Sequence, residues 1–221
     1  MAGHFLHILH GKEPSDLHRK VMDVSLILYA EHEFNASTFT ARVCASTMSD
    51  IHSCVVAAIG SLRGPLHGGA NEKAMELIEN WTSKEEAKSN IIEMLEKKEK
   101  VMGFGHAVYS IKDPRNAVIK DYAKQLSELA ENDTLYKVAE EVEKVMADEK
   151  KMFANADFFH APAYFYMGIP TMLFKPIFVM SRVSGWAAHC MEQRSNNRII
   201  RPSADYIGVE TSDWVDITER S

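Results

Sequence analysis

A 3.6-residue hydrophobic period recurs along this 221-residue chain, whereas the two-residue alternation typical of half-buried strands hardly appears. Glycine and proline are also scarce, at 11 and 7 residues, so turn signals are few. A many-stranded fold needs frequent turns, and long helices do not. The sequence therefore predicts an all-α protein.

Capping residues divide the periodic sequence into separate helices. Ser15, Asp50 and Asp133 are suitable N-caps, and Ser83 with Glu86 makes a capping box. A proline also follows Asp113, at a first helical position. We expect helices at about residues 15–32, 51–62, 72–79, 83–98, 114–129, 135–146, 157–167 and 176–193.

Apolar side chains repeat along one face of these helices, which we expect to point into the core. The inward faces are predicted to be Val118, Tyr122, Leu126 and Leu129 in one helix, and Leu135, Val138, Val142 and Val145 in the next. Residues 72–151 are rich in Glu and Lys, while residues 51–62 and 158–191 are mostly apolar. This contrast predicts a solvated helical lobe inserted into a more buried helical base.

The charge balance and the apolar runs exclude several classes of protein. Lys and Arg number 25 against 31 Asp and Glu, and the net charge of −6 argues against a nucleic-acid or anionic-membrane binder. The apolar run at 161–174 contains two prolines and is too short to span a bilayer. Because the first ten residues lack the basic region of a secretion signal, we expect a cytoplasmic protein.

The cysteines and the N-terminal histidines do not predict a metal site. The three cysteines lack CxxC spacing, so we expect reduced thiols in the core. The histidines repeat every third residue in a ragged N-terminal segment, without a carboxylate or thiol at ligand spacing, and are expected to form a solvated face. These residues are Cys44, Cys54 and Cys190, and His4, His7 and His10.

Three irregular segments each carry one titratable side chain next to a predicted helix end. They are His67 in PLHGG, His106 in GFGHA and Asp157 in NAD. Glycines let a ligand approach the backbone closely, and a helix N-terminus offers unpaired N–H groups to an anion. Taken singly, each has an ordinary explanation, as a loop histidine bonded by backbone or as an N-cap aspartate. No Walker loop, GxGxxG, HExxH or GxSxG motif occurs.

Five segments, in order and over nearly the whole chain, resemble citrate synthases. They are YAEHEFNAST, which contains His32, then GPLHGGAN, GFGHAVY followed by DPR, NADFF, and SRVSGWAAH. The segments EQR at 192–194 and RIIRPSA at 198–204 are more similar to the branch of the family that makes 2-methylcitrate. An ordered set of five is far more specific than any one of its members.

The resemblance implies condensation of an acyl-CoA, here propionyl-CoA, with oxaloacetate and water to give 2-methylcitrate and CoA. It implies that Asp157 is the base, while His67 and His106 donate hydrogen bonds to the two carbonyl oxygens. The CoA thioester is a co-substrate, and no cofactor or metal is held permanently. Phe158, Phe159 and Tyr164, close to Asp157 in sequence, are candidates for the wall that meets the methyl group of the propionyl chain, and the alternative is that they are core aromatics.

The resemblance also implies binding roles and an assembly. Oxaloacetate would be held by His32, Arg115 and Arg182, and Arg201 would reach the site of a neighbouring subunit in a homodimer. The backbone run that recognises CoA would be Val101, Met102, Gly103, Phe104 and Gly105.

The family architecture implied is a two-domain helical fold. Residues 1–63 would belong to the large domain, 64–165 would form the small domain, and 166–221 would return to the large domain and end in a C-terminal arm. The chain starts at a point well inside the family's large domain, so we expect this domain to be incomplete and the chain alone to be poorly active. Two alternatives stay open: an ordinary citrate synthase that uses acetyl-CoA, or an inactive fragment that dimerises through helices 15–32 and 51–62.

Overall fold

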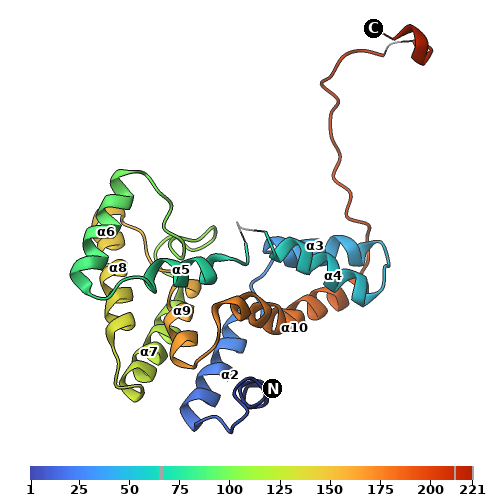
Figure 1. Cartoon of the computed structure of the whole chain (residues 1–221). Helices are drawn as coiled ribbons and strands as arrows, with labels where there is room; N and C mark the ends of the chain where they lie inside the picture. The colour runs from blue at the N-terminus through green and yellow to red at the C-terminus, as the bar shows by residue number, and fades with distance from the viewer. Residues whose placement is uncertain (65–66, 212, 221) are drawn as a thin grey trace.

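The fold is described from a computed structural model, which describes residues 1–64, 67–211 and 213–220. Over these residues the chain forms α-helices, two short 3-10 helices and one isolated β-bridge, so the all-α prediction is confirmed (Figure 1). Pro65 and Leu66 of the GPLHGGAN segment lie outside the described residues. The helices are α1 Ala2–His10, α2 Asp16–Ala30, α3 Ala36–Ser46, α4 Ile51–Leu62, α5 Ala70–Ile78, α6 Lys84–Glu96, α7 Pro114–Leu129, α8 Thr134–Lys150, α9 Ala156–Tyr166 and α10 Phe174–Ser195; the 3-10 helices are η1 Thr171–Leu173 and η2 Ile217–Glu219.

The helices pack in two groups that meet along α2, α7 and α9 (Figure 1). In the first group, α10 contacts α2, α3 and α4, and α1 packs on α2. In the second, α9 lies against α5 and α7, and α6 lies against α8. Beyond α10 the chain leaves the body as an extended tail that ends in η2 (Figure 1). We call the first group the base and the second the lobe.

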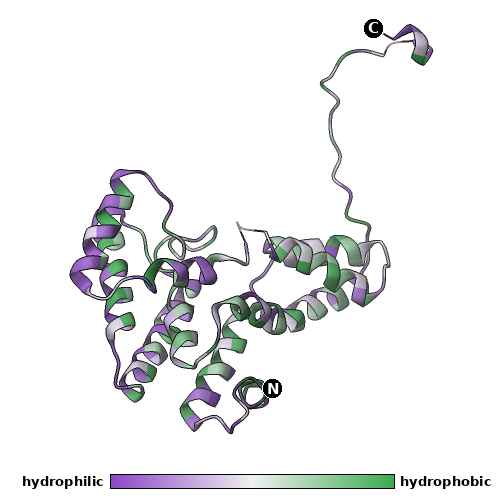
Figure 2. Ribbon diagram, viewed as in Figure 1, coloured by the Kyte–Doolittle hydropathy of each residue, from purple (hydrophilic) through white to green (hydrophobic). Residues whose placement is uncertain are grey.

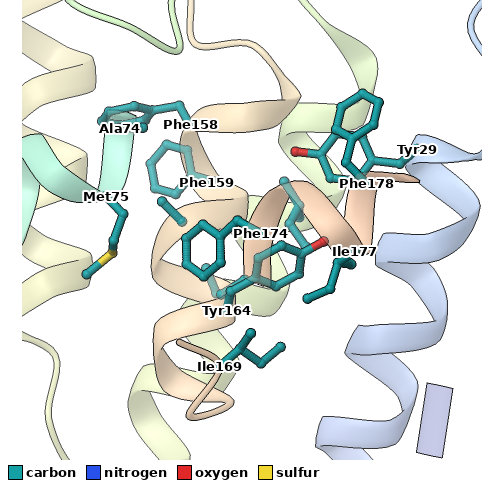
Figure 3. Packing of buried hydrophobic residues seen from close by; sticks show 14 of the residues in the cluster. Tyr29, Ala74, Met75, Phe158, Phe159, Tyr164, Ile169, Phe174, Ile177 and Phe178 are labelled. Carbon is teal, nitrogen blue, oxygen red and sulfur yellow. The ribbon is translucent and has the colours of Figure 1, made fainter. Parts of the chain in front are cut away.

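Apolar side chains from both groups fill a common core. Phe158, Phe159 and Tyr164 of α9 are fully buried, and they lie near Phe174 and Ile177 of the base (Figure 3). The outer helices of the lobe are mostly hydrophilic in Figure 2, whereas α4 and α10 are richer in apolar residues. In α8 the predicted inward face is confirmed, since Leu135, Val138, Val142 and Val145 are all buried.

Two helices were not expected from the sequence. The first ten residues, predicted to be ragged, form α1, because Ala2 and Leu6 are buried against α2. The second is α3, which is capped by Asn35 and packs on α4 and α10 through small side chains such as Ala41 and Ala45. A helix that packs through alanine and serine shows only a weak hydrophobic stripe.

The predicted inward face of α7 is partly wrong, and α4, expected to belong to a more buried base, is buried on one side only. In α7, Val118 and Leu129 are 41% and 55% exposed, and the buried face includes Asn116. The amide of Asn116 donates to Glu143 of α8, which explains how a polar residue is accommodated there. In α4, one side is buried but Val56 is 68% exposed.

The cysteines and the longest apolar run behave as expected from the sequence. Cys54 and Cys190 are buried and Cys44 is half-buried, all as free thiols. In the ranges that the structure describes, no helix is long and apolar enough to cross a membrane.

Candidate active site

A cavity of about 600 Å³ lies between the base and the lobe. All of the sequence-predicted site residues line it, except Arg201 and the three aromatic residues expected around the acyl group, although they come from six separate stretches of chain. These lining residues are His32, His67, Val101, Met102, Gly103, Phe104, Gly105, His106, Arg115, Asp157 and Arg182.

A short antiparallel pairing fixes the loop before His106 against the start of α9. Phe104 and Ala154 form a β-bridge, and the Gly105 amide donates to the Phe153 carbonyl at 2.8 Å. The side chain of Asn155 donates in turn to the Gly105 carbonyl at 3.0 Å. This pairing, which we call the strap, places residues 103–105 beside 153–155 and so brings His106 and Asp157 to the same cavity.

Gly103 is required for the strap to form. Its φ of +89° lies in the region that favours glycine, and a Cβ there would lie 2.9 Å from side-chain atoms of Phe158. Any side chain at this position would push the loop away from α9.

Asp157 lies in the first turn of α9, where the N-cap is Asn155 rather than Asp157 itself. The side chain of Asn155 accepts from the Asp157 amide at 3.0 Å. The Asp157 carboxylate accepts from the hydroxyl of Tyr29 at 2.6 Å. Burial raises the pKa of Asp157, and the Tyr29 hydrogen bond and the charges of Arg115 and Arg182 oppose that rise. A carboxylate with a raised pKa is a stronger base than an exposed one.

The hydrogen bonds around His106 determine which of its nitrogens carries the proton. Its Nδ1 lies 3.0 Å from the amide of Val108 and 3.2 Å from that of Tyr109, and both amides are donors. Nδ1 is therefore the acceptor and Nε2 carries the N–H. Nε2 lies 3.1 Å from Nε2 of His32, which must accept. Burial and Arg115 lower the pKa of both histidines, that of His32 to about 4, which keeps them neutral.

His67 is also neutral and is fixed by the start of α3. Its Nε2 lies 3.2 Å from the backbone amide of Ser37 and 2.8 Å from the Ser37 hydroxyl. Because the amide can only donate, Nε2 is the acceptor and Nδ1 carries the proton. Burial, together with the charge of Arg182, lowers the pKa of His67 to about 4. Trp186 donates to the same Ser37 hydroxyl at 3.2 Å and holds it in place.

Arg115 is held by a buried acid two residues before it. The guanidinium donates to both carboxylate oxygens of Asp113, at 3.0 and 2.8 Å. Asp113 also caps α7 and accepts from the Ala156 amide at 2.9 Å, so it joins the starts of α7 and α9. The ion pair lowers the pKa of Asp113 and raises that of Arg115, although burial acts against both shifts.

Arg182 has no comparable acid partner in the described residues. It is 2% exposed, its Nε donates to the Tyr29 carbonyl at 2.5 Å, and its guanidinium lies 4.7 Å from the Phe178 ring centre. Its Nη1 is buried without a hydrogen-bond partner. Burial lowers the pKa of Arg182 to about 10. A buried donor without a partner is costly, and a ligand carboxylate in the cavity would satisfy it.

One expectation is not tested by a single chain, and another does not match the position of the side chains. Arg201, expected to reach the site of a neighbouring subunit, lies in the exposed tail and does not line the cavity of its own chain. Phe158, Phe159 and Tyr164, expected to form a wall around the acyl group, are fully buried in the core and do not line the cavity either. The periodicity that marked them as apolar could not tell a cavity wall from a core.

Three residues of the site were not singled out from the sequence: Tyr29, Ser37 and Asp113. Asp113 was interpreted only as a helix cap, although an acid next to Arg115 also suggested an ion pair. Tyr29 and Ser37 lie within the YAEHEFNAST segment, but their partners are distant in the chain, so the segment alone does not show what they contact.

The arrangement combines one carboxylate base, two neutral imidazole donors and two guanidinium groups around one cavity. A base and fixed N–H donors suit the removal of a proton next to a carbonyl, because the donors stabilise the oxyanion that develops. Arginines suit a ligand with carboxylates. Across the residues that the structure describes, no group of three or more His, Cys, Asp or Glu side chains is placed to bind a metal ion.

The chain is similar to known proteins along its whole length. The family model described as "Citrate synthase, C-terminal domain" matches residues 1–203. A 2-methylcitrate synthase of Shewanella oneidensis is 65% identical over 220 residues, and citrate synthase 2 of Bacillus subtilis is 48% identical over 221 residues. All of this chain is aligned in both cases, but only 59% of each relative, so the chain spans about three fifths of their length.

A solved structure agrees with these sequence relatives. It is a ternary complex of citrate synthase from the thermophilic archaeon Thermoplasma acidophilum with carboxymethyl coenzyme A and oxaloacetate. It is 34% identical to this chain and superposes with a TM-score of 0.90, over 99% of this chain and 60% of the other. By its family match, its relatives and its fold, this chain belongs to the citrate synthase family.

Proposed function

We propose that the chain carries the reaction centre of an enzyme that condenses an acyl-CoA with oxaloacetate. One observation carries the proposal: His67, His106 and Asp157 line the same cavity as Arg115 and Arg182. A dimerising fragment without catalytic function would have no need to bring these five side chains together.

The reaction begins at the methyl or methylene carbon beside the thioester carbonyl. Asp157 takes a proton from this carbon, and the electron pair moves onto the thioester oxygen, where the Nδ1–H of His67 stabilises it. The resulting enol carbon attacks the carbonyl carbon of oxaloacetate. His106 donates from Nε2 to the alkoxide that forms there. Water then cleaves the C–S bond of the thioester and releases the CoA thiol.

Oxaloacetate would lie against Arg115, Arg182 and His32. The free Nη1 of Arg182 would bind one carboxylate, and the planar guanidinium of Arg115, already oriented by Asp113, would bind another. His106 would then turn its Nε2–H from His32 to the ketone oxygen. The proposed oxaloacetate-binding residues therefore line the same cavity as His67, His106 and Asp157.

The acyl-CoA would enter along residues 101–105, whose backbone the strap holds at the cavity edge. We assign residues 64–165 to a small domain that corresponds to the lobe, and the flanking residues to a large domain. Arg201, in the tail that leaves the body, would complete the site of a second subunit in a homodimer (Figure 1).

We propose propionyl-CoA as the preferred substrate and 2-methylcitrate as the product. The 65% identity to a 2-methylcitrate synthase supports this choice. Acetyl-CoA is the second candidate, supported by the 48% identity to citrate synthase 2 of Bacillus subtilis. One extra methyl group in a pocket changes kcat/KM by only about 10- to 200-fold, so acetyl-CoA should be a slower substrate rather than a rejected one.

The test is the release of free CoA thiol from a panel of acyl-CoAs in the presence of oxaloacetate. We expect thiol release with propionyl-CoA and acetyl-CoA that depends on oxaloacetate, with the larger kcat/KM for propionyl-CoA. A larger value for acetyl-CoA would make the protein an ordinary citrate synthase. No thiol release with any acyl-CoA would overturn the proposal.

The matched variant is Asp157→Asn, which keeps the shape of the side chain but cannot accept the proton. Its kcat should fall by about 10²- to 10⁴-fold, the range for loss of a general base. Oxaloacetate binding, measured by calorimetry, should stay close to that of the wild type. A variant that retains normal kcat would remove Asp157 from the role of base.

A further inference from the structure

Tyr29 is buried, yet its hydroxyl lines the cavity. It lies in the last turn of α2, its side chain is 1% exposed, and its hydroxyl donates to Oδ1 of Asp157 at 2.6 Å. Its ring stacks on His160 at 4.1 Å between ring centres. It also lies 4.3 Å from the ring of Phe178, which is labelled beside it in Figure 3. A ring packed in this way has little freedom, so the hydroxyl is fixed relative to the base.

The backbone of Tyr29 contacts the guanidinium group of Arg182, on α10. The Tyr29 carbonyl accepts from Nε of Arg182 at 2.5 Å. One residue of α2 therefore contacts both Asp157 of the lobe and Arg182 of the base. A shift of α2 would therefore disturb the contacts of both Asp157 and Arg182 at the same time.

A carboxylate has two oxygens, and in the described residues the Tyr29 hydroxyl is the partner of Oδ1 while Oδ2 has none. A rotating carboxylate would spend much of its time with neither oxygen aimed at the substrate carbon. Catalysis by a general base depends on this geometry first and on the pKa second.

We propose that Tyr29 is a positioning residue, which holds Oδ1 of Asp157 so that Oδ2 faces the carbon that loses its proton. The proposal rests on the proposed function, because it assigns a role in the same reaction. Tyr29 itself touches no reacting atom and acts through Asp157.

The same chain offers a matched control. Tyr164 is also a fully buried tyrosine, and its hydroxyl lies 2.6 Å from that of Ser25, also on α2. Its hydroxyl does not contact Asp157. Tyr29→Phe and Tyr164→Phe therefore remove the same atom from the same core, but only the first removes a hydrogen bond to the base.

The electrostatic consequence has a definite sign. Removing a donor from the ionised carboxylate disfavours the charged form, so Tyr29→Phe should raise the pKa of Asp157 further. The acid limb of the kcat profile should then move to higher pH. Of the elements packed on α9, α5 adds only Ala70 to the described cavity lining. The charged and titratable groups that face Asp157 are Tyr29 of α2, Arg115 with Asp113 at the start of α7, Arg182 of α10, and His67 and His106 of the loops.

The experiment compares pH profiles of kcat and KM for the wild type, Tyr29→Phe and Tyr164→Phe. We expect Tyr29→Phe to lower the plateau kcat by about tenfold or more, the effect of losing a hydrogen bond to a charged group. Its KM for oxaloacetate should stay within about twofold, since the Tyr29 carbonyl that holds Arg182 is retained. Tyr164→Phe should leave the acid limb where it is. The proposal would be overturned if the acid limb of the kcat profile of Tyr29→Phe stayed where it is in the wild type and its plateau kcat equalled that of Tyr164→Phe.

A second measurement does not depend on turnover. In protein labelled with ¹³C at aspartate side chains, the Asp157 signal, identified by its loss in Asp157→Asn, can be titrated by NMR. A higher pKa in Tyr29→Phe supports the hydrogen bond from Tyr29 to Asp157 even if no acyl-CoA is condensed, and it supports the positioning role where condensation is observed. An unchanged pKa in a wild type that does condense acyl-CoA overturns the proposal and leaves the proposed function intact.

Discussion

The two walls of the cavity draw their polar contacts from different distances along the chain. The lobe wall consists of residues 101–106 and the starts of α7 and α9. There, Arg115 is paired with Asp113 two residues before it, and His106 accepts from the amide of Val108. Most of this wall can form as soon as the lobe folds.

The opposite wall depends on contacts that are distant in sequence. The base wall consists of α2, residues 31–35, the start of α3 and α10. Arg182 donates to Tyr29, and Ser37 donates to His67 across the gap between base and lobe. The Nη1 of Arg182 also lacks a partner among the described residues. In the lobe wall Arg115 therefore has a charged partner close in sequence, whereas Arg182 of the base wall has a buried donor that a ligand carboxylate would satisfy.

The strongest test of the lobe wall is Asp113→Ala. The substitution leaves a buried guanidinium and the Ala156 amide without their acceptor, in a pair whose side chains are only 16% and 0% exposed. We expect the free energy of unfolding in urea to fall by about 3–5 kcal/mol. The control is Asp16→Ala, in an exposed pair with Arg19, which should cost less than about 1 kcal/mol. Equal losses in the two variants would contradict a wall held by Asp113.

The matching test of the base wall is Arg182→Ala. Oxaloacetate affinity, measured by calorimetry, should weaken by roughly 2 kcal/mol, the effect of losing a charge-assisted hydrogen bond. Arg194→Ala serves as the control, because Arg194 lies on the same helix, donates to Ser49 and does not line the cavity. Unchanged affinity in Arg182→Ala would remove this residue from the binding site.

Lowering the pH should destabilise the folded protein through protonation of His67. Its pKa in the folded protein is lowered to about 4, so below the ordinary value of 6.5 the unfolded chain binds a proton that the folded chain does not. Stability should fall as the pH is lowered from 6.5 to about 4. One such histidine changes the free energy of unfolding by at most about 1.4 kcal/mol per pH unit. In His67→Gln, the slope of the free energy of unfolding against pH should therefore be smaller. His52→Gln, at a side chain that is 94% exposed, is the control, and a slope equal to that of His67→Gln would contradict the assignment.

The smallest effect is expected for Ser37→Ala. Its backbone amide still donates to Nε2 of His67, so the losses are the contacts of the hydroxyl with His67 and Asn35 and the acceptor of Trp186. We expect kcat/KM in the thiol-release assay to fall about fivefold, equivalent to roughly 1 kcal/mol. Thr40→Ala, on the exposed side of the same helix, should have no effect. A loss of 100-fold or more would mean that the amide contributes little to fixing His67.

The same contrast explains what could be predicted from the sequence. Arg115 and its partner Asp113 both lie in the DPR segment, and His106 of GFGHA accepts from the amide of Val108 two residues later, so these segments mark their own chemistry. Tyr29 and Ser37 could not be found in this way, because their partners are 128 and 30 residues away. Their roles exist only after α2, α3 and α10 have packed.

The secondary structure shows a similar division. The helix α8, which has a strong apolar stripe, was predicted with its inward face, although its expected cap Asp133 makes no capping hydrogen bond. The helix α3 was missed because it buries serine and alanine rather than large apolar residues. The buried face of α7 was misjudged because Asn116 is buried by a hydrogen bond to Glu143, which hydrophobic periodicity cannot detect.

The strap also has a consequence for how the chain tolerates changes in length. It joins Gly105 to Asn155, 50 residues apart, so the hairpin of α7 and α8 leaves and returns at one fixed junction. The far tip of this hairpin, residues 130–133, is exposed. Insertions are accepted best at such exposed tips. A foreign domain placed there would be carried on a closed loop, and the cavity-lining side chains at its junction would keep their positions.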